Sequence, residues 1–515
     1  MDTSAAKSVS ARALTGCRHR LALEARADPA ALTPDPGAVL RQEAAAAHRA
    51  AVRDRLAASA PLAVIAPGPD ALARTRAAIA DRVPRIWGAA LPRVNGRSGH
   101  VELLQWVGDG YVPVLVVGHK VLDRGSGALI SAIDRWDPAP DDAVKPRGHR
   151  GDAMRLAHLT RMLQDTGAAS SSLLGGVIGV DGERLLVQDV EPLLQGYDER
   201  FADRLAILRG EVATAPSRIA ECRRCPWWPQ CEAELSAKRD VGLVADQTSA
   251  RALAGVGVVT VDGLAAYDGP APEDLLVPLR DLQALARAWI AGVTLVRRIP
   301  EVRVRRADVE VDVDMESFGE DGAYLWGTWL RRDGLDLGYL SFVTWDPVPT
   351  RDEARSFGAF WSWLMDRRAE AHASGRTFAA YCYSQQAENK WLLASADRFA
   401  GEPGVPTRRA VEEFIASPEW VDMFVAVGDS FLSLVGRGLK KVAPAAGFAW
   451  RDPEAGGEAS MAWYLIASGR EPGHDDAERA GQRERILQYN EDDVRATRTL
   501  REWMCSAAMD ALPVV

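Results

Sequence analysis

The chain has 515 residues, a formal net charge of −9 and only six cysteines. So few cysteines exclude a disulfide-stapled secreted scaffold, and the length predicts two or three domains. The first residues, MDTSAAKSVSARALTGC, lack the apolar run of a signal peptide, and no later segment is apolar enough to span a bilayer. We therefore expect a cytoplasmic protein without a membrane partner. The negative charge argues against general coating of nucleic acid but leaves room for a local basic groove.

Four of the cysteines have a spacing typical of a metal centre. Cys222, Cys225 and Cys231 form the pattern C-x2-C-x5-C, and Cys17 lies far upstream on a predicted amphipathic helix. Closely spaced thiolates can reach one centre from a single turn and a short helix. Two interpretations stay open. The irregular spacing favours an iron–sulfur cluster, and the alternative is a zinc site with water or His19 as the fourth ligand.

This arrangement resembles the iron–sulfur staple of RecB-like nucleases, including the AddB type and the CRISPR-associated exonucleases. The resemblance implies a [4Fe–4S] cluster that ties together the two ends of a nuclease domain at residues 1–236. Its implied ligands are Cys17, Cys222, Cys225 and Cys231.

The residues between the cysteines depart from this family at its active site. A PD-(D/E)XK nuclease needs an Asp on one strand and a Glu-x-Lys pair on the next, where carboxylates hold a divalent metal and Lys positions the water. Here the predicted strands are VELLQWV and YVPVLVVGHKV, joined by the turn GDG. Glu102 stands where the family has Asp. Val116 or Gly118 occupies the Glu position, with His119 and Lys120 just beyond.

Two further elements bear on the same active site. The segment DAMRLAHLTRML is similar to the family's Q-x-x-x-Y helix, but Arg155 and Leu159 replace the Gln and the Tyr. His48, in QEAAAAHRAAV, matches the family's metal-binding histidine, although a single His on an Ala-rich helix is more often structural. Because one acid cannot hold a catalytic Mg²⁺, we predict a degenerate domain that keeps its fold and its cluster.

Residues 237–300 are predicted to be a helical linker. SARALAGVGVVTVDGLAAYD has two short helical patterns around Gly-Val-Gly, which fits a phosphate-gripping helix–hairpin–helix or a plain helical hairpin. An amphipathic helix in PAPEDLLVPLRDLQALARAWIAG then leads to RRIPEVRVRR, residues 297–306, a basic strip in an acidic chain.

The strongest chemical signal is the segment ADVEVDVDMESFGEDGAYLWGTWL, which predicts a β-hairpin with carboxylates on one face. Asp314 and Glu316 are two residues apart, so both project from the same side of the strand. They would repel each other unless a cation lay between them. Glu310 and Asp312 share that face, so the register of the acidic pair could shift by two residues.

Further acids follow downstream. RILQYNEDDVRATRTLREW predicts a helix on which Tyr489 and Asp493 lie one turn apart, whereas Asp492 points about a hundred degrees away. In YCYSQQAENKWLLASA, Glu388 follows a serine by four residues, at a predicted strand-to-helix junction. Asp422, in EWVDMFVAV, is another acid between these segments.

These residues resemble the D-x-E motif, the acid between the two motifs (the middle acid) and the Y-x3-D motif of DEDDy exonucleases, which have a ribonuclease-H-like fold. In that family an Asn or Ser precedes the middle acid by four residues, so the resemblance favours Glu388 as the middle acid, with Asp422 as the alternative. The resemblance implies that Tyr489 orients the attacking water and that two Mg²⁺ or Mn²⁺ ions are held by Asp314, Glu316, Glu388 and Asp493. The segment GLKKVAPAAGFAW is similar to a connection that packs beneath the site, which implies contact with nucleic acid through Lys440 or Lys441.

The whole chain resembles a bacterial RecB-like nuclease family that joins these parts. The resemblance implies an α/β protein with a degenerate PD-(D/E)XK domain at 1–236, a helical hairpin at 237–300, and a ribonuclease-H-like mixed sheet flanked by helices at 301–515. The implied function is a two-metal-ion nuclease, acting as an exonuclease on DNA or RNA in nucleic-acid processing or repair. The alternative is a non-catalytic iron–sulfur scaffold that binds nucleic acid. The choice between DNA and RNA, the polarity and the identity of any protein partner stay open.

Overall fold

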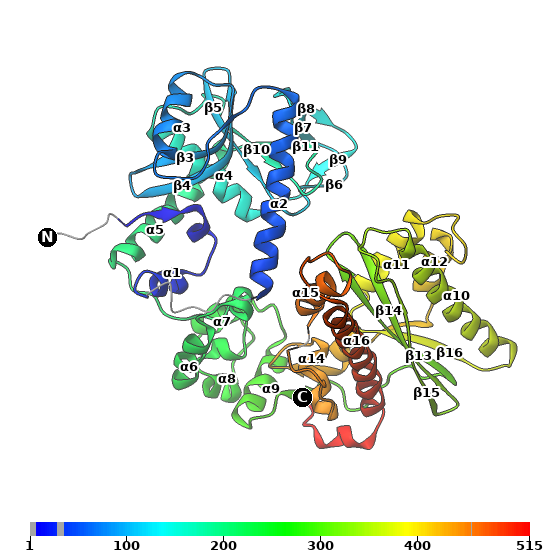
Figure 1. The fold of residues 1–515 in the computed structure, drawn as a ribbon. Coiled ribbons are helices and arrows are strands. Elements are labelled where there is room, and N and C mark those ends of the chain that lie inside the picture. The colour runs from blue at the N-terminus through cyan, green and yellow to red at the C-terminus, as the bar shows by residue number, and fades with distance from the viewer. Residues whose placement is uncertain (1–6, 28–35, 455) are drawn as a thin grey trace. The chain divides into compact units, whose positions relative to one another are not determined.

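The computed structural model describes residues 7–27, 36–454 and 456–515, and it mixes α and β structure throughout (Figure 1). The chain divides into two compact units, Met1–Ala237 and Lys238–Val515. The predicted helical linker therefore belongs to the second unit. Within the described ranges, no helix combines the length and apolarity that a bilayer crossing requires.

The first unit is built on a nine-stranded sheet with the order β2-β3-β4-β5-β10-β11-β7-β8, and β1 pairs with β4 beside this path. A two-stranded ladder, β6-β9, stands apart from it. The strands are β1 (Val9–Ser10), β2 (Ala63–Val64), β3 (Arg85–Val94), β4 (Arg97–Val107), β5 (Gly110–Val116), β6 (Leu122–Arg124), β7 (Ala128–Ala132), β8 (Ala139–Asp141), β9 (Val144–Pro146), β10 (Leu174–Ile178) and β11 (Arg184–Asp189).

The predicted hairpin around the GDG turn is confirmed. Val107 pairs with Gly110, and Gly108 has a φ of 62°, which a glycine adopts without steric cost. All seven residues of β5 are buried. Such a strand, covered on both faces, reads as a continuous apolar run rather than an alternating one.

Helices cover both faces of this sheet. The amphipathic α4 buries Leu156 and Leu159 in one core, whereas Val52 and Leu56 of α2 pack in a second core with residues of β4, β5 and β10. The helices are η1 (Ala11–Leu14), α1 (Arg18–Glu24), α2 (Pro36–Ser59), α3 (Ala71–Ala80), α4 (Arg150–Asp165), η3 (Glu191–Leu193), α5 (Leu194–Arg209), η4 (Ala220–Arg224) and α6 (Trp228–Lys238).

The prediction that Cys17 lies within a helix is wrong. Cys17 is the residue just before α1 and has an extended backbone with ψ of 130°. The preceding Gly16 separates η1 from α1, because glycine has low helix propensity and interrupts what the sequence pattern suggested was one helix.

The second unit contains a five-stranded sheet with the order β15-β14-β13-β16-β17. The first three strands along the chain form an antiparallel meander, while β16 and β17 run parallel to β13. A small ladder pairs β12 with β18. The strands are β12 (Leu295–Arg297), β13 (Val309–Phe318), β14 (Gly322–Arg332), β15 (Leu335–Val343), β16 (Phe378–Cys382), β17 (Trp420–Asp422) and β18 (Phe431–Ser433).

The helices of this unit begin with the predicted hairpin, α7 and α8, whose connection contains Gly257 at a φ of 82°. The helices are η5 (Val241–Leu243), α7 (Gln247–Gly255), α8 (Val261–Ala266), α9 (Leu279–Ile290), α10 (Asp352–Ala373), α11 (Gln386–Arg398), α12 (Arg408–Ile415), α13 (Met423–Ser430), α14 (Leu439–Val442), η6 (Ala443–Ala446), α15 (Gly457–Ala467), α16 (Asp476–Met504) and η7 (Ala507–Ala511).

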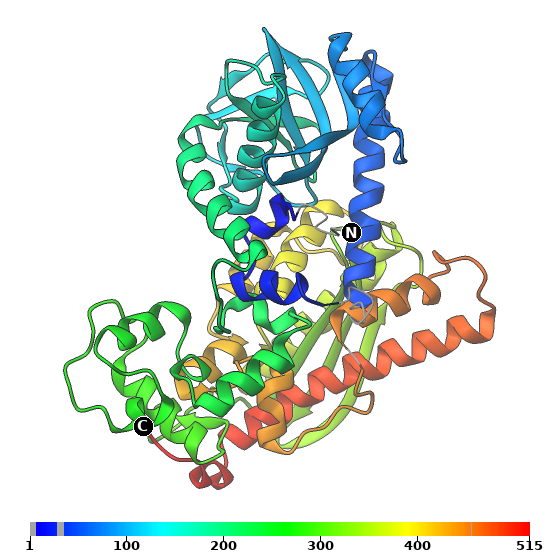
Figure 2. The ribbon, with the colours of Figure 1, turned by 90° about the vertical axis from the view of Figure 1, so that its left-hand side faces the viewer.

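The alternating pattern of β13 divides its side chains between two environments. Val311 and Val313 pack in an apolar core with Phe357 and Phe360 of α10. The acids at alternate positions point the other way, toward α16, which lies along the sheet in Figures 1 and 2. One face of the strand therefore builds the core, and the other carries charge.

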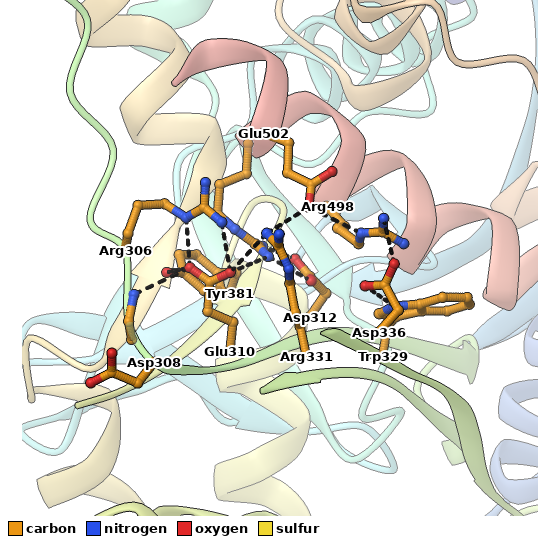
Figure 3. A network of polar contacts seen from close by, with 12 residues as sticks. Arg306, Asp308, Glu310, Asp312, Trp329, Arg331, Asp336, Tyr381, Arg498 and Glu502 are labelled. Carbon is orange, nitrogen blue, oxygen red and sulfur yellow. Dashed lines mark hydrogen bonds and ion pairs between the residues drawn. The ribbon is translucent and has the colours of Figure 1, made fainter. Parts of the chain in front are cut away.

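Two of the four acids on that face are neutralised by arginines (Figure 3). The fully buried Arg501 of α16 donates to both Asp312 and Glu310. Arg306 donates to Glu310 at 2.6 and 2.9 Å, as Figure 3 shows. Burial would raise the pKa of Glu310, but the Arg306 hydrogen bonds and the Arg501 charge lower this pKa to about 2. Burial raises the pKa of Asp312 to about 6.

Replacing Arg501 with methionine should therefore destabilise the second unit strongly. The substitution leaves Glu310 and Asp312 buried without their shared cation, and breaking a buried ion pair costs about 3–5 kcal/mol. Denaturant unfolding followed by circular dichroism measures this loss. Arg409→Met is the control, because its pair with Glu413 lies at the exposed surface and contributes little to stability. Equal stability of the two variants would contradict this account.

Candidate functional site

The remaining acids on β13 meet a third carboxylate from α16. Ligand oxygens of Asp314, Glu316 and Asp493 all lie within 4.8 Å of one another. Glu316 and Asp493 are buried, and Asp314 is partly exposed. In the described part of the chain, no arginine forms an ion pair with any of the three, in contrast to Glu310 and Asp312.

The pKa values of this cluster contrast with that of Glu310 on the same strand, which is lowered. Burial, with the charges of Asp493 and Glu316, raises the pKa of Asp314 well above its usual value. Burial also raises the pKa of Glu316 to about 8 and that of Asp493 to about 6, and the charge of Lys440 only partly offsets these shifts. These three carboxylates cannot all ionise at low cost, because their charges repel one another. A bound divalent cation would stabilise their charged forms.

Hydrogen bonds from neutral side chains orient each carboxylate. Asn490 Nδ2 donates to Asp314 at 2.7 Å, Ser460 Oγ donates to Glu316 at 2.6 Å, and Trp450 Nε1 donates to Asp493 at 2.6 Å. Each bond satisfies one carboxylate oxygen and adds no charge, so the repulsion within the cluster remains. The sequence analysis did not identify these three positioning residues. Only Asn490 carried a signal, since it stands one helical turn before Asp493.

Asn490 also requires a glycine in the neighbouring strand. A Cβ on Gly327 of β14 would come within 1.6 Å of Asn490 Oδ1, and Tyr339 of β15 donates to that same oxygen at 2.7 Å. The amide of Asn490 is thereby fixed with its NH₂ group toward Asp314. Close approach of α16 to the sheet at Gly327 thus sets the position of the cluster.

Tyr489 lies beside the cluster with its ring buried. Its pKa is raised well above the usual value by burial and by the charges of Glu316 and Asp493, so the phenol stays protonated and can donate a hydrogen bond. Lys440 Nζ lies 4.7 Å from the centroid of the Tyr489 ring. Lys441, its neighbour on α14, is exposed.

The two candidates for the middle acid have different surroundings. Glu388, in the first turn of α11, is buried, its pKa is raised by burial to about 8, and its charge contributes to the raised pKa of Asp314. Among the described residues, Glu388 Oε2 has no hydrogen-bond partner. Glu388 is not one of the three acids within 4.8 Å, although its charge acts on Asp314.

Asp422 is instead engaged with the backbone. Its carboxylate accepts hydrogen bonds from the amides of Ser384, Gln385 and Phe424 at 3.0, 3.2 and 2.9 Å. It therefore caps α13 and holds the turn between β16 and α11, where Ser384 has a φ of 71°. Through this turn Asp422 positions Glu388.

Asp492, the neighbour of Asp493, points away from the cluster. Its carboxylate accepts from the amide and the Nε of Arg451, both at 2.9 Å. The register shift to Glu310 and Asp312 is likewise not adopted, because Arg501 occupies the space that faces those two acids.

The four cysteines of the first unit line one pocket. Cys17, Cys222, Cys225 and Cys231 surround it, together with His19 and both tryptophans of the CPWWPQC segment. Burial and the neighbouring thiols raise the pKa of Cys231 to about 11. This set of sulfur donors fits a thiophilic metal centre. His19 Nδ1 contacts Thr214 Oγ1 at 2.9 Å, and its buried Nε2 lacks a partner within the described ranges.

The predicted nuclease cleft of the first unit contains a second acid that the sequence analysis missed. Glu102 forms an ion pair with Arg155 at 2.8 Å. Asp152, one turn earlier on α4, lines the same cleft of about 410 Å³ with His119 and His149. The interpretation that Glu102 is the one remaining acid is therefore incomplete. Asp152 escaped notice because it lies outside the family's motif positions.

Of the other predicted residues of this region, Val116 and Gly118 line the same cleft, whereas Lys120, His48 and Leu159 are not among its lining residues. Lys120 is exposed, Val116 and Leu159 are buried, and His48 of α2 faces Gly182. The buried Nε2 of His48 has no hydrogen-bond partner in the part of the chain described.

Residues 406–505 match the sequence model of the RNase_H superfamily. The match runs from α12 to α16 and includes Tyr489 and Asp493, whereas Asp314, Glu316 and Glu388 precede it. A foamy viral protease–reverse transcriptase in complex with double-stranded DNA shares 11% identity over 71% of each chain, and its TM-score of 0.12 is too low to support a fold argument. No curated protein matches the chain. The chain thus contains an RNase H-like region near its C-terminus, which indicates a metal-dependent nuclease acting on nucleic acid.

Proposed function

We propose that residues 301–515 form a two-metal-ion exonuclease of the DEDDy type, which hydrolyses phosphodiester bonds of DNA or RNA. The observation that carries the proposal is the convergence of Asp314, Glu316 and Asp493 within 4.8 Å, with raised pKa values. Two-metal sites place their ions roughly 3.5–4 Å apart. Carboxylates whose ligand oxygens lie within 4.8 Å of one another can reach such a pair of ions. Without a bound cation, the raised pKa values favour the protonated form of these carboxylates, whereas a cation would stabilise their charged form.

The roles of the residues follow from their surroundings. Asp314, Glu316 and Asp493, together with Glu388, would hold Mg²⁺ or Mn²⁺, which supplies an activated water and stabilises the charge of the leaving oxygen. Tyr489 keeps its proton and is placed to orient the water. Asn490, Ser460 and Trp450 hold the carboxylates in position without neutralising them.

For the first unit, we propose a degenerate RecB-like domain closed by a [4Fe–4S] cluster. The support is the shared pocket of Cys17, Cys222, Cys225 and Cys231, which gathers a distant cysteine with three clustered ones. The domain would contribute binding of nucleic acid rather than cleavage, because Arg155 is paired with the acid that remains at the motif position.

Asp314→Asn should reduce cleavage by orders of magnitude in a nuclease assay with Mn²⁺. It keeps the shape and the Asn490 contact but removes a ligand charge, and the ions supply most of the transition-state stabilisation. Asp493→Asn should behave alike, and Tyr489→Phe should lose less because only the water's orientation is affected. Single-stranded DNA, duplex DNA and RNA substrates identify the preferred nucleic acid.

Three further variants test whether the loss is specific to the proposed metal ligands. Asp397→Asn on α11 alters an exposed acid and should leave the rate unchanged. Glu388→Gln should impair cleavage, whereas Asp422→Asn should stay near normal, since the amide oxygen still accepts from the amides of Ser384 and Phe424 and only the longer hydrogen bond from Gln385 is lost. Equal cleavage by the wild type and Asp314→Asn would place the catalytic centre elsewhere. Absence of cleavage on every substrate would favour the nucleic-acid-binding scaffold.

In the metal-free protein, the carboxylate cluster should lower the free energy of unfolding as the pH rises. The folded pKa of Glu316, about 8, exceeds its ordinary value of about 4.3, so the folded state binds a proton that the unfolded chain releases between these pH values. Glu316→Gln should therefore gain melting temperature relative to the wild type between about pH 5 and pH 8. Thermal scans in chelator measure the difference. A difference that is independent of pH would contradict the raised pKa.

If the four cysteines hold a [4Fe–4S] cluster, the protein should be brown and contain iron and sulfide after anaerobic purification. Cys17→Ala should lose the visible absorption and increase proteolysis of the first unit, because the cluster joins distant parts of that unit, while the second unit is spared. Cys505→Ala is the control, since this exposed cysteine follows α16. A colourless protein with one zinc ion per chain would instead support the zinc interpretation.

A further inference from the structure

Three potential metal ligands meet in the first unit, away from the cysteine pocket. The structure brings one ligand atom each from His119, His149 and Asp152 within 4.8 Å of one another. Asp152 Oδ2 lies 2.8 Å from His119 Nε2, and Asp152 Oδ1 lies 3.2 Å from His149 Nδ1. The two imidazole rings are 4.2 Å apart between centroids.

The local fold explains this convergence. His119 follows the end of β5, while His149 caps the N-terminus of α4 and its Nδ1 accepts from the amide of Asp152 at 3.3 Å. Asp152 lies in the first turn of α4, where the helix dipole favours a carboxylate, and its side chain is 7% exposed. Because α4 packs on β5, the buried carboxylate of Asp152 lies next to both rings.

The accessibility of the three groups suits an ion that enters from solvent. The side chains of His119 and His149 are 39% and 53% exposed, so a ligand can approach between them. The carboxylate is the buried base of the site, and it contacts both rings through different oxygens.

We propose that His119, His149 and Asp152 bind one divalent transition-metal ion, for which zinc is the best match. Two imidazole nitrogens and one carboxylate oxygen are the donors of many zinc sites with an open position, whereas Mg²⁺ prefers oxygen ligands alone. This site differs from the carboxylate cluster of the second unit in its donors and lies in the other unit.

The cleft around the site supports an anionic ligand at the open position. Arg12, Arg49 and Arg155 line it with the three proposed ligands. Glu102 lies in the same cleft, and its buried Oε2 has no hydrogen-bond partner among the described residues. A phosphate group, whether free or in a nucleic acid, has the charge that these arginines and a metal ion would attract.

The test measures zinc bound by the full-length chain after chelation and readdition of Zn²⁺. Elemental analysis should find one zinc ion fewer per chain in His119→Gln/His149→Gln and in Asp152→Asn than in the wild type. His100→Gln, an exposed histidine on β4, should bind as the wild type does. Comparing variants with the wild type removes any contribution of the cysteines, since these are unchanged in every protein.

Cobalt substitution adds a spectroscopic measurement. The difference between wild-type and His119→Gln spectra should show Co²⁺ absorption bands without sulfur charge-transfer bands, because no thiolate belongs to the site. Because His119 is partly exposed, this single variant should fold, which circular dichroism verifies. Asp314→Asn should retain the zinc, so this proposal and the nuclease proposal can fail separately. Equal zinc content in the wild type and all folded variants would leave only a hydrogen-bonded His–Asp–His cluster and overturn the proposal.

Discussion

The charge balance on one face of β13 is the constraint on which the second unit depends. Four acids project from this strand toward α16, and each buried charge costs several kcal/mol unless it is paired. Arg501 and Arg306 neutralise Glu310 and Asp312. Asp314 and Glu316 lie close to a third acid, Asp493, instead. Arginines therefore balance the acids at one end of the strand, and no arginine pairs with the acids at the other end among the described residues. A strand that only stabilised the fold would not need this deficiency.

Helix α16 both neutralises acids at one end of β13 and positions a carboxylate at the other end. Arg501 and Asn490 both extend from α16 to β13, the first supplying charge and the second only a hydrogen bond. Since the approach at Gly327 leaves room for no side chain, the helix cannot shift without losing contacts at both ends of the strand. Stability and the geometry of the carboxylate cluster are therefore coupled through the packing of α16.

The first unit follows a similar logic with different donors. Sulfur ligands separated by about two hundred residues of chain share one pocket, and imidazole and carboxylate groups share a cleft near α4. The soft sulfur donors and the harder nitrogen and oxygen donors therefore line two different pockets of this unit. Under the two metal-site proposals for this unit, the softness of the donor atoms would decide which metal each site prefers.

The sequence alone determined the features that depend on local periodicity. Alternation along residues 309–318 placed four acids on one face, helical spacing joined Tyr489 to Asp493, and the cysteine pattern indicated a metal centre. Only the tertiary structure decided which pair of acids forms the cluster, because Arg501 lies 189 residues from Asp312 in sequence and nothing local encodes their pairing. The same holds for Asp152, which acquires its histidine partners through the packing of α4 on β5. Periodicity specifies the direction of a side chain, whereas its partner across the fold depends on how distant elements pack.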